Sequence, residues 1–363
     1  MKQVWITAKG GPETLQVREA PDPQVGAGQL RIRVAFAGIN FADIQARMGQ
    51  YPDAPPVPCV VGYEVAGIVD QIGAGVSGFA EGDRVLTFTR FGGYSDTVVV
   101  DASWVHKVPA SVSLEAAAAV PVNYATAWTM LIRLGALQPG ETVLVHSAGG
   151  GVGIAALQIC QWRGATAIGT ASAGKHTRLK ELGYAHCIDY RSQNFEKEIM
   201  RYTKGRGVDV VLDPQGGNSF RRSYRCLAPL GRLFMFGMAA SVQGERMSVL
   251  ALLRAFVTTP WFHPLSLLNN NRGVFGTNMG RLFEEFDRLT PDMVEIVRLL
   301  GEGILAPVVD KVFPFEEAAA AHHYLQDRRN FGKVLLRARE DSEGRQSRIV
   351  DDNTDVQKTR LAF

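Results

Sequence analysis

The sequence predicts an α/β protein made of a β-barrel-like domain and a doubly wound parallel sheet. Up to about residue 120, short runs of alternating apolar residues are separated by turns that contain glycine or proline, a pattern typical of barrels. From about residue 122, strand-like and helix-like segments alternate, which indicates a parallel sheet covered by helices. One strand-like run leads through a glycine cluster directly into a helical pattern, as in sheets that bind dinucleotides.

Length and composition bound the class of protein. The 363 residues allow two domains that each bury a core, and the net charge of +3 gives no argument for nucleic-acid binding. The four cysteines are scattered, so we expect neither a disulfide framework nor a cysteine zinc site. We find no signal peptide and no apolar run long enough to span a bilayer, and therefore expect a cytoplasmic protein.

The expected elements follow in order. In the first part, residues 30–36 alternate with a period of two, and residues 97–100 do so less regularly, so both are predicted strands. In the second part, the predicted strands are 142–146, 166–170, 208–212 and 232–236. The predicted helices there are 123–134, 152–163, 175–182 and 195–203. Near the end we expect a helix at 290–301, a strand at 306–313, a helix at 315–325 and a strand at 332–336.

The glycine cluster follows the predicted strand at residues 142–146. It includes Gly150, Gly151 and Gly153, but Ala148 stands where the first glycine of the strict dinucleotide pattern would be. Glycines let a pyrophosphate approach the backbone, and the helix N-terminus offers unpaired N–H groups and a positive dipole end. The cluster therefore predicts a dinucleotide site, with a glycine-rich turn that binds nothing as the alternative.

The next predicted strand indicates which dinucleotide. Its end carries Ser172 and Lys175, and no acidic residue that would bind a ribose 2′-hydroxyl. A hydroxyl and a cation attract a 2′-phosphate, so NADPH is favoured over NADH; alternatively, Lys175 is an exposed residue of the following helix. Two later strand ends, which contain Gly216 and Phe236–Gly237, also suit a cofactor crevice.

Two segments stand apart from this pattern. Residues 247–271 are apolar but interrupted by Pro260 and Pro264, and we predict an apolar helical insertion beside the cleft. It would form a wall for substrate, a patch that contacts a membrane peripherally, or simply core packing. Residues 339–363 are polar and aperiodic, and are predicted to be a disordered tail.

Six motifs carry a resemblance to a known superfamily: residues 37–43, 62–67, 82–85, 148–153, 188–190 and 332–336. Through them, the chain from residue 1 to about 337 resembles the medium-chain dehydrogenases/reductases, and within these the zinc-free quinone oxidoreductase branch. Residues 138–146 and 169–176 make it most similar to the synaptic vesicle membrane protein VAT-1 group of that branch.

The resemblance implies a GroES-like barrel domain over residues 1–121, completed by residues 305–338, and a Rossmann domain over residues 122–304. It also implies a cofactor in the cleft between the domains and a homodimer. The full set of residues expected to bind NADPH is Asn40, Thr126, Gly150, Gly151, Val152, Gly153, Ser172, Lys175, Tyr190, Gly216, Phe236, Gly237 and Lys333.

The same comparison argues against zinc. Zinc alcohol dehydrogenases of this superfamily carry a Cys near the position of Asn40 and a His at the position of Tyr63, and this chain has neither. Without a Lewis acid, the expected reaction is hydride transfer to a small conjugated acceptor, which spreads the incoming charge over its own oxygen. We therefore expect an NADPH-dependent reductase of a quinone or an α,β-unsaturated carbonyl.

Two side chains are candidate catalytic donors to that oxygen, Asn40 and Tyr51, with Tyr63 less suited. Alternatively, Asn40 caps a turn and Tyr51 is a packed surface residue. Some family members have a second Tyr five residues after the Asn, where this chain has Gln45. An enoyl-thioester reductase, or a largely non-enzymatic NADPH-binding protein at a membrane or partner surface, stays an alternative function.

Overall fold

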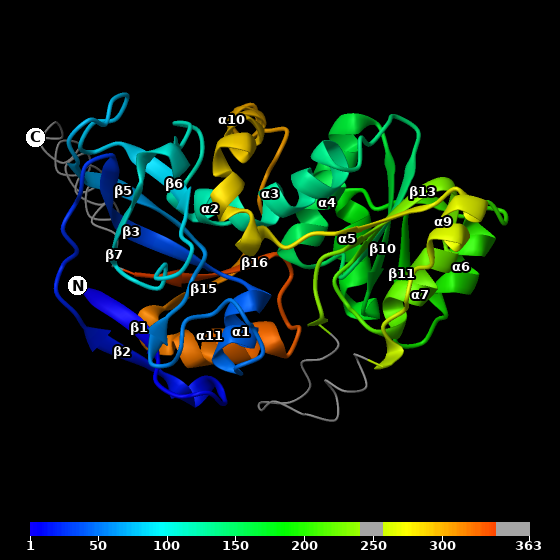
Figure 1. Cartoon of the computed structure of the whole chain (residues 1–363), viewed down its shortest axis with the longest axis horizontal. Helices are drawn as coiled ribbons and strands as arrows, with labels where there is room; N and C mark the ends of the chain where they lie inside the picture. The colour runs from blue at the N-terminus through cyan, green and yellow to red at the C-terminus, as the bar shows by residue number, and fades with distance from the viewer. Residues whose placement is uncertain (240–256, 339–363) are drawn as a thin grey trace, which may run out of the picture.

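The computed structural model describes residues 1–239 and 257–338, which form two domains side by side (Figure 1). The first domain is built on β3 (Gln29–Ile39), whose Leu30, Ile32 and Val34 are buried while Arg33 faces solvent. This period-two alternation gives the strand one core face, as the sequence predicts. The larger sheet has the order β15-β16-β3-β5-β6-β8 with β7 also paired to β3, and a smaller sheet has the order β2-β1-β4. The strands of this domain from the first half of the chain are β1 (Lys2–Ile6), β2 (Leu15–Glu19), β4 (Cys59–Val60), β5 (Glu64–Ile72), β6 (Arg84–Phe88), β7 (Thr97–Asp101) and β8 (Val105–Lys107).

The second domain is a six-stranded sheet in the order β11-β10-β9-β12-β13-β14, and every pair in it is parallel. The chain reverses direction across the sheet at β9, so the crevice for a ligand is expected at the carboxyl ends of β9 and its two neighbours. The strands are β9 (Thr142–His146), β10 (Thr166–Ala171), β11 (His186–Asp189), β12 (Val208–Asp213), β13 (Leu227–Met235) and β14 (Gly273–Gly276). The helices around them are α3 (Pro121–Trp128), α4 (Gly151–Arg163), α5 (His176–Leu182), α6 (Phe195–Tyr202), α7 (Asn218–Arg225) and α10 (Phe286–Gly301).

The end of the described chain returns to the first domain. β16 (Lys333–Arg337) pairs antiparallel with β3, opposing Val334 to Ile39, and parallel with β15 (Val309–Pro314). In the sequence between β15 and β16, α11 (Ala318–Gln326) packs beside α1 (Phe41–Arg47). Residues from the two ends of the chain therefore lie next to each other at the junction with the second domain.

The two domains share one continuous apolar core. Phe36, Leu86 and Phe88 of the barrel belong to the same buried cluster as Val145 and Leu157 of the second domain. α2 (Leu114–Ala118) and α3 lie at this junction (Figure 1). The two-domain α/β fold predicted from the sequence, a domain of short strands beside a doubly wound parallel sheet, is confirmed.

Several elements differ from expectation. Neither α7 nor β14 was predicted from the sequence. α7 has few apolar residues and buries only Phe220 and Ser223, and β14 has four residues, two of them glycine. β13 begins at Leu227, five residues before the predicted strand, and its pairing with β12 has a register shift. The predicted helix 123–134 instead begins at Pro121 and continues after Trp128 as one π-helical turn.

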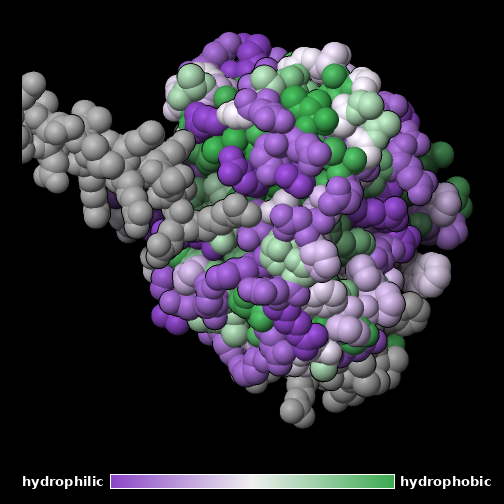
Figure 2. Space-filling view, turned by 90° about the vertical axis from the view of Figure 1, so that its left-hand side faces the viewer, coloured by the Kyte–Doolittle hydropathy of each residue, from purple (hydrophilic) through white to green (hydrophobic). Residues whose placement is uncertain are grey.

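The apolar insertion is described only in part, since residues 247–256 lie outside the described chain. The rest contains α9 (Pro264–Asn270), which lies next to β14 at the end of the molecule away from the barrel and not beside the cleft (Figure 1). Trp261, Leu265 and Leu268 are exposed, Trp261 by 95%, so core packing is wrong for these side chains. The opposite end of the molecule is hydrophilic over much of its surface, and its hydrophobic side chains are most numerous in its upper part (Figure 2).

The predicted tail, residues 339–363, lies outside the described chain. Among the helices that the structure describes, none has the length and apolar character needed to cross a bilayer.

Candidate cofactor and active site

The glycine turn brings a helix N-terminus to the carboxyl edge of the second sheet. β9 ends at His146 and α4 begins at Gly151, with extended backbone at Gly150. A Cβ on Gly153 would lie 2.5 Å from the carbonyl oxygen of Ala148, so a larger residue would push the turn away from the helix. The 13-residue helix α4 thus presents its unpaired N–H groups where an anion can approach the backbone.

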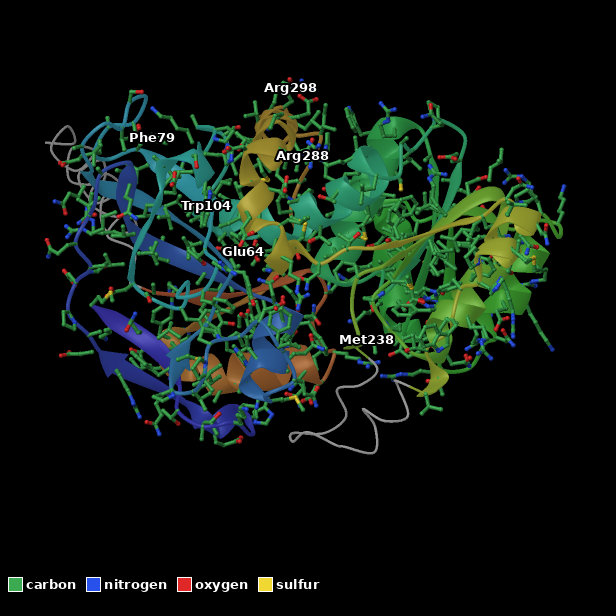
Figure 3. The ribbon with its side chains drawn as sticks, in the orientation of Figure 1. Glu64, Phe79, Trp104, Met238, Arg288 and Arg298 are labelled. Carbon is green, nitrogen blue, oxygen red and sulfur yellow. The ribbon has the colours of Figure 1, made fainter. Side chains whose placement is uncertain are left out.

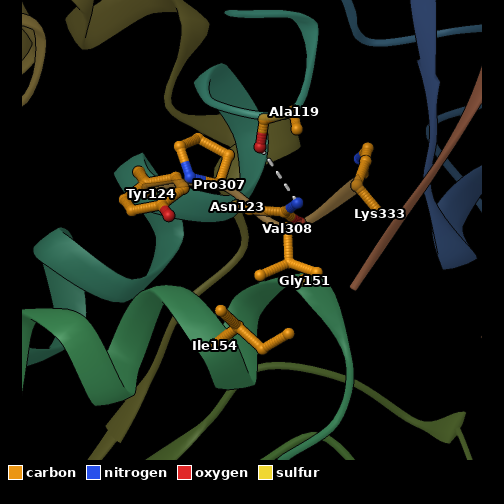
Figure 4. Close-up of a pocket in the computed structure, with 8 residues that line it drawn as sticks. All are labelled: Ala119, Asn123, Tyr124, Gly151, Ile154, Pro307, Val308 and Lys333. Atoms are coloured by element: carbon orange, nitrogen blue, oxygen red, sulfur yellow. Dashed lines mark hydrogen bonds between the residues drawn. The ribbon is translucent and has the colours of Figure 1, made fainter. Parts of the chain in front are cut away.

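The other wall of this region comes from the returning segment of the barrel domain. Gly332 donates its backbone N–H to the carbonyl of Gly149 at 2.9 Å. The side chain of Asn123 lies against Gly151. These two residues and Lys333 line a cavity of about 10 Å³, close to the size of one water molecule (Figure 4). Expected pyrophosphate ligands and the expected ligand Lys333 are therefore neighbours.

A cluster of cations lies on one side of this turn. The Lys175 ammonium donates to the backbone carbonyls of Arg328 at 3.0 Å and Asn330 at 2.5 Å, and its burial lowers the Lys175 pKa. Burial raises the pKa of Tyr190, but hydrogen bonds and charge from Arg328 and Arg191 outweigh it, so the net shift is downward. Two guanidiniums that lower the pKa of a neighbouring phenol mark a place that favours a negatively charged group such as a phosphate.

On the other side of the turn, three buried side chains form a closed hydrogen-bonded unit. Lys333 donates to Asn40 Oδ1 at 2.7 Å and to Glu64 Oε1, and Asn40 Nδ2 donates to the same Glu64 oxygen at 2.9 Å. Glu64 lies where the barrel strands meet the second domain (Figure 3), and it is fully buried, as Lys333 nearly is. We call Asn40, Glu64 and Lys333 the buried triad.

Beneath the triad lies a second buried carboxyl group. Asp43 accepts hydrogen bonds from the backbone N–H groups of Asn40 and Gly62 and from the hydroxyl of Tyr94, at 2.8, 3.1 and 3.1 Å. Burial raises the pKa of Asp43 to about 7, although these hydrogen bonds and the charge of Lys333 oppose the rise. The backbone at Asn40 is thereby fixed independently of its side chain.

The remaining predicted residues are arranged differently. Tyr51 directs its hydroxyl to Asn278 Oδ1 of the second domain at 3.3 Å and packs edge-on against Tyr63; no hydrogen bond among the described residues joins it to Asn40. The Thr126 hydroxyl donates to the carbonyl of Val122 within its own helix at 2.6 Å.

The other predicted cofactor ligands lie in strand-end loops. Ser172 makes no capping bond at the turn that follows β10. A Cβ on Gly216 would meet the sulfur of Met238, and one on Gly237 would meet the carbonyl of Pro214. The loops after β12 and β13, which contain Gly216, Phe236 and Gly237, therefore pack against each other, while Val152 follows Gly151 in the first turn of α4.

Sequence reasoning missed Glu64, Asn123, Arg191 and Arg328 as site residues. Glu64 stood within a family motif and had no assigned role. Arg328 and Arg191 are distant in sequence from Lys175, so only the fold reveals that they share a cluster.

The donors around Asn40 do not fit a zinc ion. The Lys333 ammonium already donates to Asn40 and Glu64, and its charge would repel a second cation. Over residues 1–239 and 257–338, no three His, Cys, Asp or Glu side chains converge as metal ligands would.

Comparisons with known proteins identify the family to which both domains belong. Residues 26–110 match the alcohol dehydrogenase GroES-like domain, and residues 182–336 match a family described as zinc-binding dehydrogenase. The chain is 40% identical over 334 residues to the synaptic vesicle membrane protein VAT-1 homolog of Homo sapiens, covering 91% of this chain and 85% of that protein.

Two solved structures are also similar. The Escherichia coli quinone oxidoreductase complexed with NADPH has a TM-score of 0.81 at 29% identity, covering 93% of this chain and 100% of that one. The JamJ enoyl reductase has a TM-score of 0.81 at 25% identity, covering 93% and 98%. Proteins of this fold therefore include oxidoreductases that bind a nicotinamide cofactor.

Proposed function

The chain belongs to the medium-chain dehydrogenase/reductase superfamily, among the relatives of VAT-1, and we propose that it is an NADPH-dependent, zinc-independent reductase of quinones or α,β-unsaturated carbonyls. One observation carries the proposal: the N-terminus of α4 lies between a cluster of cations and a buried amide. The first suits a phosphorylated dinucleotide, and the second suits an acceptor oxygen that gains negative charge.

Different residues along the cleft would bind different parts of the cofactor. Gly150, Gly151 and Gly153 would hold the pyrophosphate against the helix N-terminus. Lys175, Tyr190, Ser172, Arg191 and Arg328 would bind the 2′-phosphate, and for this Lys175 exchanges its backbone carbonyl partners for the phosphate oxygens.

At the reacting end, NADPH supplies the hydride when bound. One N–H of the Asn40 amide donates to Glu64, and the other N–H makes only a long contact, 3.5 Å from Nδ2 to the carbonyl oxygen of Gly38. This second N–H would donate to the acceptor oxygen, and solvent would protonate the product. Tyr51 would line the entrance and donate there only by releasing Asn278.

Oxidation of NADPH, followed by absorbance, tests the proposal. The acceptors are phenanthrenequinone, benzoquinone, a medium-chain alkenal with a conjugated double bond, and crotonyl-CoA, each run also with NADH. Turnover of a quinone or the alkenal, faster with NADPH than with NADH, supports it. Turnover of crotonyl-CoA alone would identify an enoyl-thioester reductase, the activity named for the JamJ protein.

A second candidate function has a specific observation in its favour. Val257, Trp261, Leu265 and Leu268 expose apolar side chains by 72%, 95%, 61% and 69%, and the last two lie on α9, at the end of the molecule away from the barrel (Figure 1). Such a patch suits a membrane-associated NADPH-binding protein. Flotation with liposomes, with and without anionic lipid, distinguishes the two: a protein that floats and turns over no acceptor has this second function.

A homodimer is also proposed, because β14 is the outermost strand of the second sheet and its outer edge has no partner strand among the described residues. Light scattering after gel filtration measures the mass, and a monomer at micromolar concentration would contradict it.

A further inference from the structure

Glu64 accepts hydrogen bonds from both other members of the buried triad and from the second domain. Its Oε1 accepts from Asn40 Nδ2 and Lys333 Nζ, and its Oε2 accepts from the backbone N–H of Val122 at 2.7 Å. Val122 lies in the first turn of α3, next to Asn123, whose side chain lies against Gly151 at the start of α4. The carboxylate therefore joins the barrel to the helix that carries the wall of the cofactor site.

These contacts allow the Asn40 amide only one orientation. Its oxygen accepts from the Lys333 ammonium and its nitrogen donates to the Glu64 carboxylate. A flipped amide would place its NH₂ against the ammonium and its oxygen against the carboxylate, and both contacts are repulsive. With the amide fixed in this way, the second N–H of Asn40 keeps one direction.

The surroundings leave little room for the triad to relax. Glu64 is 0% exposed, Lys333 3% and Asn40 9%. A Cβ on Gly38 would lie 2.5 Å from Glu64 Oε1 and 2.7 Å from Lys333 Cε, so the strand under the triad is closely packed against it. A buried ion pair adds little net stability, because desolvation offsets its attraction, whereas it does hold directional groups in place.

We propose that Glu64 is a positioning residue for the reaction: it fixes the Asn40 amide, and through it the hydrogen bond to the acceptor oxygen. The inference rests on the proposed function, since it assigns Glu64 a role in that chemistry. Glu64 does not itself contact the reacting atoms; it acts through Asn40.

Glu64→Gln tests the inference because it keeps the shape of the side chain. A carboxamide has one oxygen for three donors, and its own NH₂ faces either Val122 N–H or the ammonium, so the unit loses its single arrangement. We expect kcat to fall by at least about tenfold, with the Kd for NADPH changed less. Glu64→Asp, which keeps the charge on a shorter side chain, is the second variant if the amide variant folds poorly.

A double-mutant cycle with Asn40→Ala separates positioning from a general loss of structure. If Glu64 acts through Asn40, Glu64→Gln reduces kcat in the native background but by no more than about twofold in the Asn40→Ala background. If the double variant instead loses kcat by the product of the two factors measured for the single variants, the two residues act independently and the inference is overturned.

Asp209→Asn is the matched control. Asp209 is also a buried carboxylate that accepts a backbone N–H, from Thr142 at 2.8 Å, and pairs with Arg206, but it lies at the amino end of β12. This variant should lower stability without lowering kcat. An equal loss of kcat in the control would assign the effect of Glu64 to stability and overturn the inference.

A readout without turnover keeps the inference testable apart from the proposed function. In protein labelled with ¹⁵N-asparagine, the Asn40 side-chain amide, assigned by its loss in Asn40→Ala, should exchange its protons slowly, and Glu64→Gln should remove that protection. Fast exchange in the native protein would overturn the inference. Slow exchange in a protein that reduces no acceptor would support the positioning and contradict the proposed function.

Discussion

The two sides of the cleft handle charge in opposite ways. Around Lys175, the arginines are exposed, Tyr190 is 40% exposed, and the hydrogen bonds of the ammonium within the described part of the chain go to backbone carbonyls. Around Glu64, the charged groups are buried and bonded to one another. The cationic cluster, which is more exposed, can exchange its backbone partners for a phosphate at low cost, whereas the buried triad cannot change without leaving a charge unpaired.

This difference assigns different measurable roles to the two sides. Substitutions in the cationic cluster should alter which cofactor binds and how tightly. Substitutions in the triad should alter stability and the rate of the reaction. A substitution in the cationic cluster that lowers the reaction rate, or one in the triad that changes which cofactor binds, would contradict this division of roles.

The largest expected effect is on stability, from Lys333→Met. It leaves Glu64 buried without its counter-charge, which costs about 3–5 kcal/mol in the free energy of unfolding. Urea unfolding followed by circular dichroism measures this, and adding Glu64→Gln should recover part of the loss because no charge remains. Arg288→Met is the control, since its ion pair with Glu285 is exposed and contributes at most about 1 kcal/mol. Equal losses in the two single variants would show that the triad behaves like a surface pair.

The next effect is on cofactor choice, from Lys175→Ala. Loss of a charge-assisted hydrogen bond of about 1.5–3 kcal/mol should raise the Kd for NADPH roughly tenfold to a hundredfold and leave the Kd for NADH nearly unchanged. Titration by nicotinamide fluorescence measures both constants. Lys180→Ala, an exposed lysine one turn along α5, should change neither. An equal loss for NADPH and NADH would mean that Lys175 does not contact the 2′-phosphate.

A smaller effect on stability and cofactor binding is expected from Gly153→Ala, in the glycine turn between the cationic cluster and the triad. Its Cβ would meet the backbone of Ala148 at 2.5 Å, so the turn must shift, at a cost of about 1–3 kcal/mol in stability and with weaker binding of both cofactors. Gly174→Ala is the matched control, because a Cβ there meets nothing within 4 Å. Thermal unfolding and fluorescence titration measure both variants. If Gly153→Ala weakened the binding of only one of the two cofactors, the result would contradict the account.

The last expected effect is a pH dependence of stability beneath the triad. Burial raises the pKa of Asp43 to about 7, above that of the unfolded chain, so the folded protein holds a proton there that the unfolded chain releases. This contribution is present at low pH and is lost as the pH rises through about 7. The stability of the native protein relative to Asp43→Asn should therefore fall between about pH 4 and 7, as measured by thermal unfolding. A difference that rises with pH would contradict the burial of an uncharged Asp43.

The sequence predicted what depends on local chemistry. The alternation in β3 and the glycine turn before α4 are each written in a few consecutive residues, and the structure has both. The triad joins residues separated by 24, 269 and 293 positions, and no local pattern indicates such contacts. For the same reason, nothing around Tyr51 reveals that its hydroxyl meets Asn278, 227 residues further along.

The central claim is that the cofactor's hydride reaches a conjugated carbonyl in this cleft. Incubating the protein with NADPH deuterated at the transferable position and a conjugated alkenal, then analysing the product by mass spectrometry, tests it directly. The account predicts a saturated aldehyde with one deuterium on the carbon β to the carbonyl. Unchanged, unlabelled alkenal in the presence of protein saturated with NADPH would contradict it.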